Sequence, residues 1–287
     1  MSTDIRLTKA LLSLDGLSVG DAFGQLFFTI SPHGTSNDLP PGPWPWTDDT
    51  QMALSVVEVL RTYGHIEQDA LVKAFVRRFD EDPHRGYARG AKDLLRQVAK
   101  GADWREIAPK LFGTGSYGNG AAMRVAPVGA FFYDDLQQAA QEARLSAVTT
   151  HAHIEGQAGA MAVAVAAALA ANHPRPTGRD FLHEVLPFVP ETVTKERLRK
   201  AMEIPPAELD EAVRQLGSGS EVTAQDTVPF CLWSAAHHLE DFETALWWTA
   251  KGMGDCDTTC AIVGGIVALS SPGIPESWLQ RREPLKW

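Results

Sequence analysis

The segment from Ala158 to Ala171 constrains the fold of this chain more than any other. It consists almost entirely of small apolar residues, most of them alanine. Alanine is the strongest helix former, and its small side chain lets neighbouring backbones approach closely. The segment is too short to cross a bilayer, since a spanning helix takes about 20 apolar residues. We therefore expect a central helix that packs tightly against its neighbours.

Apolar residues recur at helical spacing along most of the remaining chain, beginning with Leu7, Leu11 and Leu14. Patterns that alternate as in a β-strand are scarce. A chain of 287 residues can bury a large core, and neither an interdomain linker nor an internal repeat divides it. These observations predict an all-α fold with a single domain over residues 1–287. The further predicted helices span residues 52–60, 70–79, 90–100, 136–148, 179–186, 194–202, 207–216, 228–238, 242–251 and 258–269.

Composition narrows the classes of function. The formal net charge is −10 and no run of Lys and Arg opposes it, so stable nucleic-acid binding is not expected. Cys231, Cys256 and Cys260 form neither a disulfide framework nor the paired pattern of a structural zinc site. The N-terminus lacks the order of a signal peptide, and no segment predicts a membrane span. We expect a cytoplasmic monomer.

Two acidic clusters, each at the start of an apolar segment, are the strongest functional signal. The first is Thr47-Asp48-Asp49-Thr50, and the second, far along the chain, is Gly254-Asp255-Cys256-Asp257-Thr258-Thr259. Carboxylate and hydroxyl oxygens are hard ligands that suit Mg²⁺, Mn²⁺ or Ca²⁺. If the fold brings the two clusters together, they form one metal site.

The alternative interpretation of these aspartates is helix capping. Asp48 is followed three residues later by Gln51, as in a capping box, and Asp257 could cap the next helix. A cap needs one acceptor, whereas each cluster offers two carboxylates that repel each other unless a cation neutralises them. A helix N-terminus contributes about 0.3–1 kcal/mol toward that. Adjacent residues also point in different directions on a helix, which favours bridging a pair of cations.

A glycine-rich loop, Gly113-Thr-Gly-Ser-Tyr-Gly-Asn-Gly120, precedes the apolar segment 121–132. Its spacing formally matches a dinucleotide fingerprint, but no βαβ unit surrounds it and the lysine of a Walker A loop is missing. Successive glycines expose backbone N–H groups, and a predicted helix N-terminus follows, so the loop suits an anion. Tyr117 can stack on a base or a ribose. A tight connection between helices explains the glycines equally well.

Histidines give a weaker signal. His151 and His153 form a His-x-His pair at the start of the alanine-rich helix, which is one pattern of a zinc site. Spacing by two residues separates the rings on a helix, so a capping or hydrogen-bonding role is at least as well supported. His237 and His238 lie near a predicted helix end, where a structural role is expected.

Taken together, these residues resemble the ADP-ribosylglycohydrolase family. The matching motifs run in order along nearly the whole chain and are specific in combination. They are Gly20-Asp21-Ala22-Phe23-Gly24, Trp46-Thr47-Asp48-Asp49-Thr50-Gln51-Met52, Ser116-Tyr117-Gly118-Asn119-Gly120-Ala121-Ala122-Met123-Arg124, Thr150-His151, Val228-Pro229-Phe230 and Gly254-Asp255-Cys256-Asp257-Thr258.

The resemblance implies a compact orthogonal helical bundle with a binuclear cleft for two Mg²⁺ or Mn²⁺ ions. It also implies hydrolysis of the bond between the ribose anomeric carbon and an acceptor, and the loop is most similar to the branch acting on serine-linked ADP-ribose. For the reaction we assign Asp48, Asp49 and Asp257 as catalytic carboxylates. The implied metal ligands are Thr47, Asp48, Asp49, Asp255, Asp257 and Thr258, and the implied ADP-ribose contacts are Gly115, Ser116, Tyr117, Gly118, Asn119, Gly120, Met123 and His151.

One position departs from the family pattern. Many members have a glutamate seven residues after the aspartate of Gly-Asp-x-x-Gly, which binds a metal and, in the serine-specific branch, acts in catalysis. Here that position is Phe28, which can neither bind a cation nor accept a proton. Asp82 is a speculative replacement acid, and a turn residue before Pro83 is the competing interpretation. Two alternatives therefore stay open, an ADP-ribose-binding protein without activity and a crystallin-like structural protein.

Overall fold

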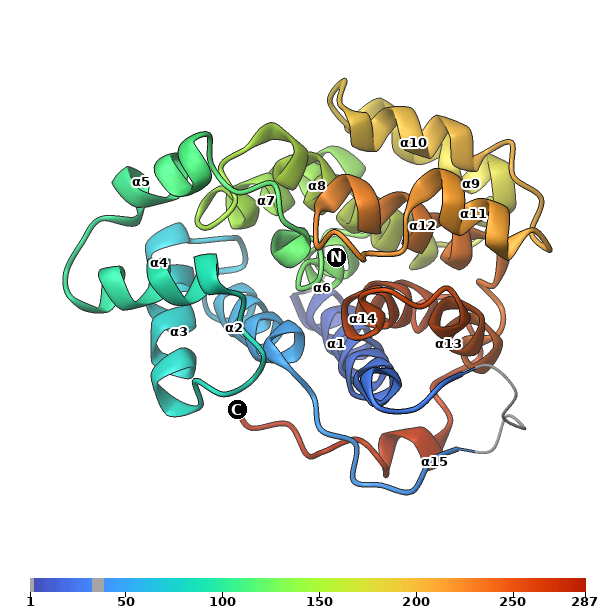
Figure 1. Ribbon diagram of the computed structural model, residues 1–287, viewed down its shortest axis with the longest axis horizontal. Helices are drawn as coiled ribbons and strands as arrows, with labels where there is room; N and C mark the ends of the chain where they lie inside the picture. The colour runs from blue at the N-terminus through green and yellow to red at the C-terminus, as the bar shows by residue number, and fades with distance from the viewer. Residues whose placement is uncertain (1–2, 33–38) are drawn as a thin grey trace.

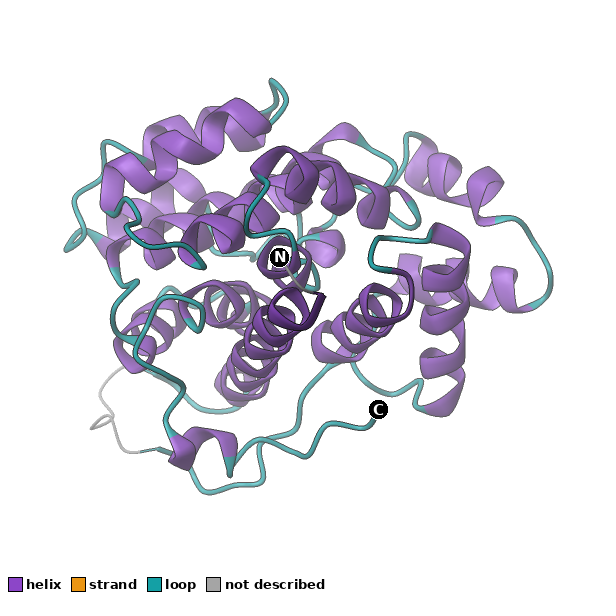
Figure 2. Cartoon of the chain, turned by 180° about the vertical axis from the view of Figure 1, so that it is seen from behind, coloured by secondary structure: helices purple, strands orange, loops and turns teal. Residues whose placement is uncertain are grey.

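The computed structural model describes residues 3–32 and 39–287, and within these ranges the chain is built from helices without a β-strand (Figures 1 and 2). The all-α prediction is confirmed. None of the described helices has the length and apolarity needed to cross a membrane. The helices are α1 (Thr3–Gln25), η1 (Leu26–Phe28), α2 (Asp48–Tyr63), α3 (Gln68–Glu81), α4 (Arg89–Ala99), α5 (Trp104–Ile107), η2 (Ala108–Gly113), η3 (Asn119–Ala121), α6 (Ala126–Phe131), α7 (Leu136–Val148), α8 (Ile154–Ala170), α9 (Gly178–Val185), η4 (Leu186–Phe188), α10 (Val193–Ala201), α11 (Leu209–Leu216), α12 (Ala224–His237), α13 (Phe242–Lys251), α14 (Cys256–Val267) and α15 (Glu276–Leu279).

The alanine-rich helix α8 is buried along almost its entire length, as predicted. Small residues on α8 and on the helices packed against it allow this close packing. A methyl group built on Gly129 of α6 would lie 1.9 Å from the Ala164 carbonyl oxygen, so the two backbones are in direct contact. Such close approach is available to glycine and alanine but not to larger side chains.

Two predictions of helix bounds were wrong, each because of a proline. The apolar segment 121–132 is divided, with α6 beginning at Ala126 and Pro127 in its first turn. Helix α12 begins at Ala224 and continues through Pro229, which the prediction placed near its start. Because Pro229 has no N–H, the Gln225 carbonyl one turn earlier lacks its helical donor. Arg197 Nη1 donates to that carbonyl at 2.7 Å, which satisfies it.

Helices α1 and α14 cross at the centre of the molecule, side by side in Figure 1. Three glycines of α1, spaced by four residues, form the contact face. Methyl groups built on Gly16, Gly20 and Gly24 would lie 2.3, 2.0 and 2.1 Å from carbonyl oxygens of α14. The crossing therefore sets the C-terminal half of α1, which carries Asp21, beside the N-terminal turn of α14, which carries Asp257.

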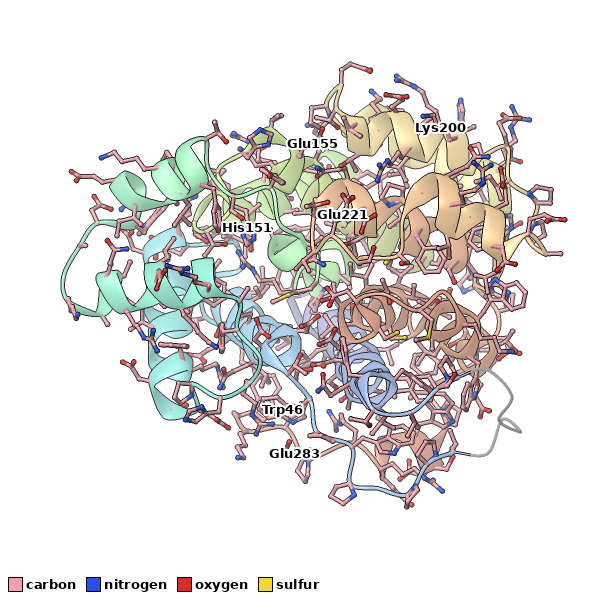
Figure 3. All side chains as sticks on the ribbon, in the orientation of Figure 1. Trp46, His151, Glu155, Lys200, Glu221 and Glu283 are labelled. Carbon is pink, nitrogen blue, oxygen red and sulfur yellow. The ribbon has the colours of Figure 1, made fainter. Side chains whose placement is uncertain are left out.

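The start of α2 is held from outside the bundle. Trp44, in the loop that leads to α2, donates its backbone N–H to the Arg281 carbonyl at 2.6 Å and accepts from the Glu283 N–H at 2.8 Å. Arg85 lies over the Trp46 ring and pairs with Glu283, which Figure 3 shows beside Trp46. The C-terminal segment thus fixes the loop that delivers the first acidic cluster.

Candidate active site

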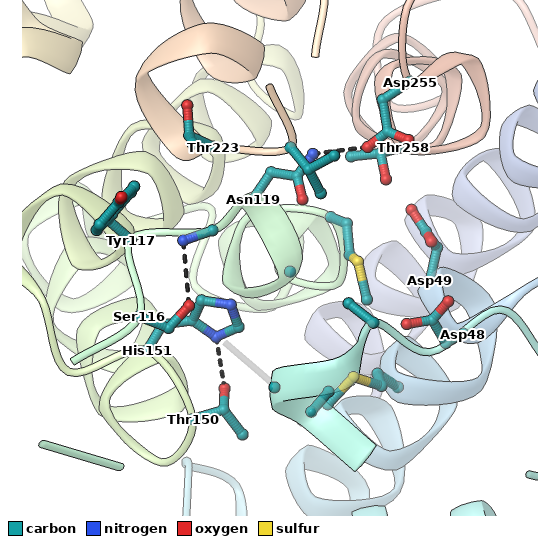
Figure 4. A pocket seen from close by; sticks show the side chains of 18 of the residues that line it. Asp48, Asp49, Ser116, Tyr117, Asn119, Thr150, His151, Thr223, Asp255 and Thr258 are labelled. Atoms are coloured by element: carbon teal, nitrogen blue, oxygen red, sulfur yellow. Dashed lines mark hydrogen bonds between the residues drawn. The ribbon is translucent and has the colours of Figure 1, made fainter. Parts of the chain in front are cut away.

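The two acidic clusters meet in one cavity of about 390 Å³. The first cluster begins α2 and the second begins α14, and both helix starts open toward the same space (Figure 4). Asp48 and Asp49 both line it although they are adjacent. The cavity, called the central cavity below, is also lined by Asp255, Asp257 and Thr258.

Asp21, for which no role was predicted, holds the first cluster in place. This fully buried carboxylate accepts the Thr47 N–H at 2.9 Å and the Thr50 N–H at 3.1 Å. It also accepts the hydroxyls of Thr47 at 2.9 Å and Thr50 at 2.5 Å. The signal that could have identified it was the Gly-Asp-x-x-Gly motif, because that spacing places the aspartate beside the glycines of the α1–α14 crossing.

The capping interpretations of Asp48 and Asp257 were wrong. Thr47 is the N-cap of α2, and its hydroxyl accepts the Asp49 N–H at 3.4 Å. Asp255 occupies the N-cap position of α14 without a side-chain cap bond, and Asp257 lies in the first turn. Gln51 does not close a capping box either, because its amide bonds the Arg78 carbonyl and the Tyr87 hydroxyl. Asp257 Oδ1 accepts the Thr258 N–H at 2.8 Å within the first turn, whereas neither Asp48 nor Asp255 caps its helix through the side chain.

Burial and crowding raise the pKa of every carboxylate in the group. Burial raises the pKa of Asp48 to about 7, and the charges of Asp21 and Asp255 add to it. Burial and then the neighbouring carboxylates raise the pKa values of Asp49 and Asp257 well above their usual range. Like charges confined in a low-dielectric space cannot all ionise unless a cation accompanies them.

The donor set fits a hard divalent cation. Asp49 Oδ1 is buried and receives no hydrogen bond from the described residues, so it is available as a ligand. Asp48, Asp255, Asp257 and Thr258 supply further oxygens around the same space. In the described part of the chain, no three acidic, histidine or cysteine side chains are already close enough to enclose an ion. Thr47 lies behind the aspartates, where its hydroxyl bonds the carboxylates of Asp21 and Asp49.

The glycine loop lies along the central cavity next to the carboxylates. Residues 116–120 line the cavity, as do Met123 and His151. Asn119 joins the two parts, because its Nδ2 donates to Asp255 Oδ2 at 2.7 Å (Figure 4). Gly115 does not line the cavity, since it turns the chain with φ of +84° against the His153 backbone.

Several of the loop N–H groups expected to receive an anion are used inside the protein, and that of Gly115 donates to the Leu111 carbonyl at 2.8 Å. The Gly118 N–H donates to Ser116 Oγ and the Asn119 N–H to the Val222 carbonyl, both at 3.2 Å. Tyr117 is 42% exposed, so its ring remains accessible to a ligand. The loop therefore offers polar side chains and an aromatic face beside the acidic group.

The two neighbouring histidines have separate roles, so the zinc interpretation was wrong. His153 is the N-cap of α8, where its Nδ1 accepts the Glu155 N–H at 3.1 Å. His151 faces the loop, and its Nδ1 lies 2.7 Å from Thr150 Oγ1. Burial, followed by the charge of Arg124, lowers the pKa of His151 to about 3. His151 is thus a neutral ring at the cavity wall.

Neither Phe28 nor Asp82 belongs to the cavity. Phe28 ends η1 and is 54% exposed at the surface. Asp82 follows α3 and pairs with Arg85 Nε at 2.8 Å. The proposal of Asp82 as a replacement acid therefore has no support from its position.

His151 gives a testable pH dependence of stability. Because its folded pKa is near 3 and the unfolded value is 6.5, the unfolded chain binds one more proton between these values. The contribution of neutral His151 to the free energy of unfolding is therefore fully present above pH 6.5 and is lost as the pH falls toward 3. We expect the free energy of unfolding to drop by about 2 kcal/mol more in the wild type than in His151→Gln between pH 7.5 and 5. Urea unfolding of both proteins measures this, and equal slopes would contradict it.

Comparisons with known proteins agree with the geometry. The family model described as ADP-ribosylglycohydrolase matches residues 1–287. An uncharacterized protein of Archaeoglobus fulgidus is 30% identical over 279 residues, covering 92% of this chain and 88% of that protein. ADP-ribosylhydrolase ARH3 of Homo sapiens is 29% identical over 274 residues, covering 83% and 74%. ADP-ribosylarginine hydrolase Tri1 of Serratia proteamaculans is 27% identical over 292 residues, covering 96% and 75%. A solved structure described as an ADP-ribosylglycohydrolase-related protein complex shares the fold, with a TM-score of 0.71 and 23% identity over 98% of this chain and 94% of that one.

Proposed function

Because this chain belongs to the ADP-ribosylglycohydrolase family, we propose that it is a metal-dependent hydrolase that releases ADP-ribose from a modified acceptor. The reaction cleaves the bond at the anomeric carbon of the ribose. The acceptor is a protein side chain, a nucleic acid or a small ADP-ribosyl conjugate.

One observation carries the proposal: the carboxylates and the glycine loop share the central cavity. The Asn119 side chain bonds Asp255, so a nucleotide on the loop lies next to the acidic group. A cavity of about 390 Å³ is within the range of sites for small ligands. The proposed ADP-ribose contacts are Gly115, Ser116, Tyr117, Gly118, Asn119, Gly120, Met123 and His151, of which Gly115 acts through the turn that it forms.

The carboxylates have two tasks in this proposal. Two Mg²⁺ or Mn²⁺ ions would neutralise the aspartates, orient the ribose hydroxyls and lower the pKa of water. The residues that would hold them are Asp48, Asp49, Asp255, Asp257 and Thr258, with Thr47 behind. Asp48, Asp49 and Asp257 stabilise the positive charge that develops at the anomeric carbon. A carboxylate of this group also accepts the proton of the attacking water.

A second candidate function, ADP-ribose binding without hydrolysis, is favoured by Phe28. This residue stands where many family members have a glutamate, and its side chain is exposed outside the central cavity, so the position supplies no acid to the site. In the described residues, the acidic side chains that line the cavity are Asp48, Asp49, Glu221, Asp255 and Asp257. Catalysis must therefore use one of these.

A substrate panel tests both candidates. The protein is incubated with arginine-, serine- and nucleic-acid-linked ADP-ribose and with O-acetyl-ADP-ribose, in Mg²⁺, Mn²⁺ or a chelator, and free ADP-ribose is quantified. We expect release from at least one substrate, with loss of that release in the chelator. Calorimetric binding of ADP-ribose without turnover would establish the binding protein instead. Absence of both binding and metal uptake would leave a crystallin-like structural role.

A further inference from the structure

A fully buried arginine, Arg124, connects the glycine loop to the cavity wall. Its Nη1 donates to the Gly120 carbonyl at 3.2 Å. Its Nη2 donates to the Ser146 carbonyl at 2.9 Å and to Thr150 Oγ1 at 3.0 Å. Burial lowers the pKa of Arg124 to about 9, so it remains a cation at neutral pH. All three hydrogen bonds come from one guanidinium group, whose plane fixes their directions.

Thr150 links Arg124 to His151 by hydrogen bonds. Its hydroxyl oxygen accepts from Arg124 and lies 2.7 Å from His151 Nδ1. The hydroxyl carries a single hydrogen, and no other acceptor among the described residues bonds it. A hydrogen on Nδ1 would leave the buried hydroxyl without an acceptor, a state that folded proteins avoid. The hydroxyl hydrogen therefore points at Nδ1, and the ring carries its own hydrogen on Nε2.

We propose that Arg124 and Thr150 are positioning residues that fix His151 as the Nε2–H tautomer, a neutral hydrogen-bond donor to an oxygen of the bound ligand. The direction of Nε2 supports this, because a methyl group built on Gly118 or Gly120 would lie 3.3 or 3.2 Å from it. Figure 4 shows the ring between Thr150 and the loop. The identity of the ligand as ADP-ribose rests on the proposed function, whereas the tautomer does not.

The glycines of the loop follow from the same arrangement. Side chains at positions 118 and 120 would press against the imidazole, and the one at 120 would meet its Cε1 at 3.0 Å. None of the described residues accepts a hydrogen bond from Nε2. Because Arg124 also donates to the Gly120 carbonyl, a single guanidinium group holds the position of the loop and, through Thr150, the orientation of the imidazole that faces it. Loop and ring are thereby presented to a ligand in a fixed relation.

The tautomer is measured directly by long-range ¹H–¹⁵N correlation spectra of the full-length protein with ¹⁵N-labelled histidine. The His151→Gln variant identifies the His151 signals among the nine histidines. In the wild type we expect hydrogen on Nε2 and none on Nδ1 at pH 7. Thr150→Val, which keeps the shape and removes the hydroxyl, should release the ring into a mixture of tautomers. Thr150→Ser restores the hydroxyl and should restore the single tautomer.

Ligand affinity gives the second readout. Calorimetry with ADP-ribose is expected to show about tenfold weaker binding for Thr150→Val and a change within about twofold for Thr150→Ser. Hydrogen on Nδ1 in the wild type, or an unchanged tautomer in Thr150→Val, would overturn the proposal. If Thr150→Val does not fold, the tautomer measured in the wild-type spectra still tests the proposal. A wild type with the Nε2–H tautomer but no affinity for ADP-ribose would refute the proposed function and leave the positioning role standing.

Discussion

Asp257→Asn is expected to lower the rate of metal-dependent ADP-ribose release on the order of a thousandfold. Asparagine keeps the size of the side chain but removes the charge that a divalent cation requires. Asp257 lines the central cavity beside Asp255, in the first turn of α14, and its Oδ1 accepts the Thr258 N–H at 2.8 Å, a bond that the amide oxygen of asparagine can keep. The loss should therefore appear in turnover and in metal binding rather than in folding.

Thermal unfolding separates these effects. In the wild type, millimolar Mg²⁺ should raise the unfolding midpoint, because a ligand that binds the native state stabilises it. In Asp257→Asn this shift should largely disappear, whereas the metal-free midpoint should stay equal or rise, since one source of carboxylate repulsion is gone. The matched control is Asp80→Asn on the exposed face of α3, which should change neither rate nor metal response. Full activity of Asp257→Asn would refute the assignment.

Gly20→Ala is expected to cost more stability than any other methyl group added to α1. The new methyl would lie 2.0 Å from the Cys260 carbonyl oxygen and 2.6 Å from its carbon, so two helix backbones must separate. Overpacking of a rigid core costs about 1–3 kcal/mol and more where backbone must move, and we expect at least about 3 kcal/mol here. The helix propensity that alanine adds, roughly 1 kcal/mol, does not offset this.

Denaturant unfolding measures the loss directly. The control on the same helix is Leu12→Ala, whose side chain is 38% exposed and whose removal should change stability by no more than about 0.5 kcal/mol. Because the crossing also sets Asp21 beside the acidic clusters, Gly20→Ala protein that remains folded should bind Mg²⁺ more weakly. A stable Gly20→Ala protein with normal Mg²⁺ binding would show that the crossing does not position the site.

Many of the helices could be predicted from the sequence, because a helix depends mainly on residues that are neighbours in the chain. Helices α7 and α13 have the predicted bounds, since periodic apolar residues and an aspartate N-cap act within one or two turns. The start of α12 was missed because the acceptor freed by Pro229 is satisfied by Arg197 from another helix. The capping of α2 was misassigned for the same kind of reason, as Asp21 on α1 decides which oxygen faces the helix start.

The sequence by itself determined the residue types of the site, namely paired carboxylates at two helix starts and a glycine loop with a tyrosine. The tertiary structure decided that they share one cavity, because the glycines of α1 let α14 approach to backbone contact. It also placed Phe28 and Asp82 outside the cavity. Asp21, Arg124 and Thr150 gained their roles only in the tertiary structure, because those roles depend on hydrogen bonds between residues far apart in the sequence. Burial, which raises the pKa values of the aspartates and keeps His151 neutral, is a property of the packed chain and has no counterpart in a local pattern.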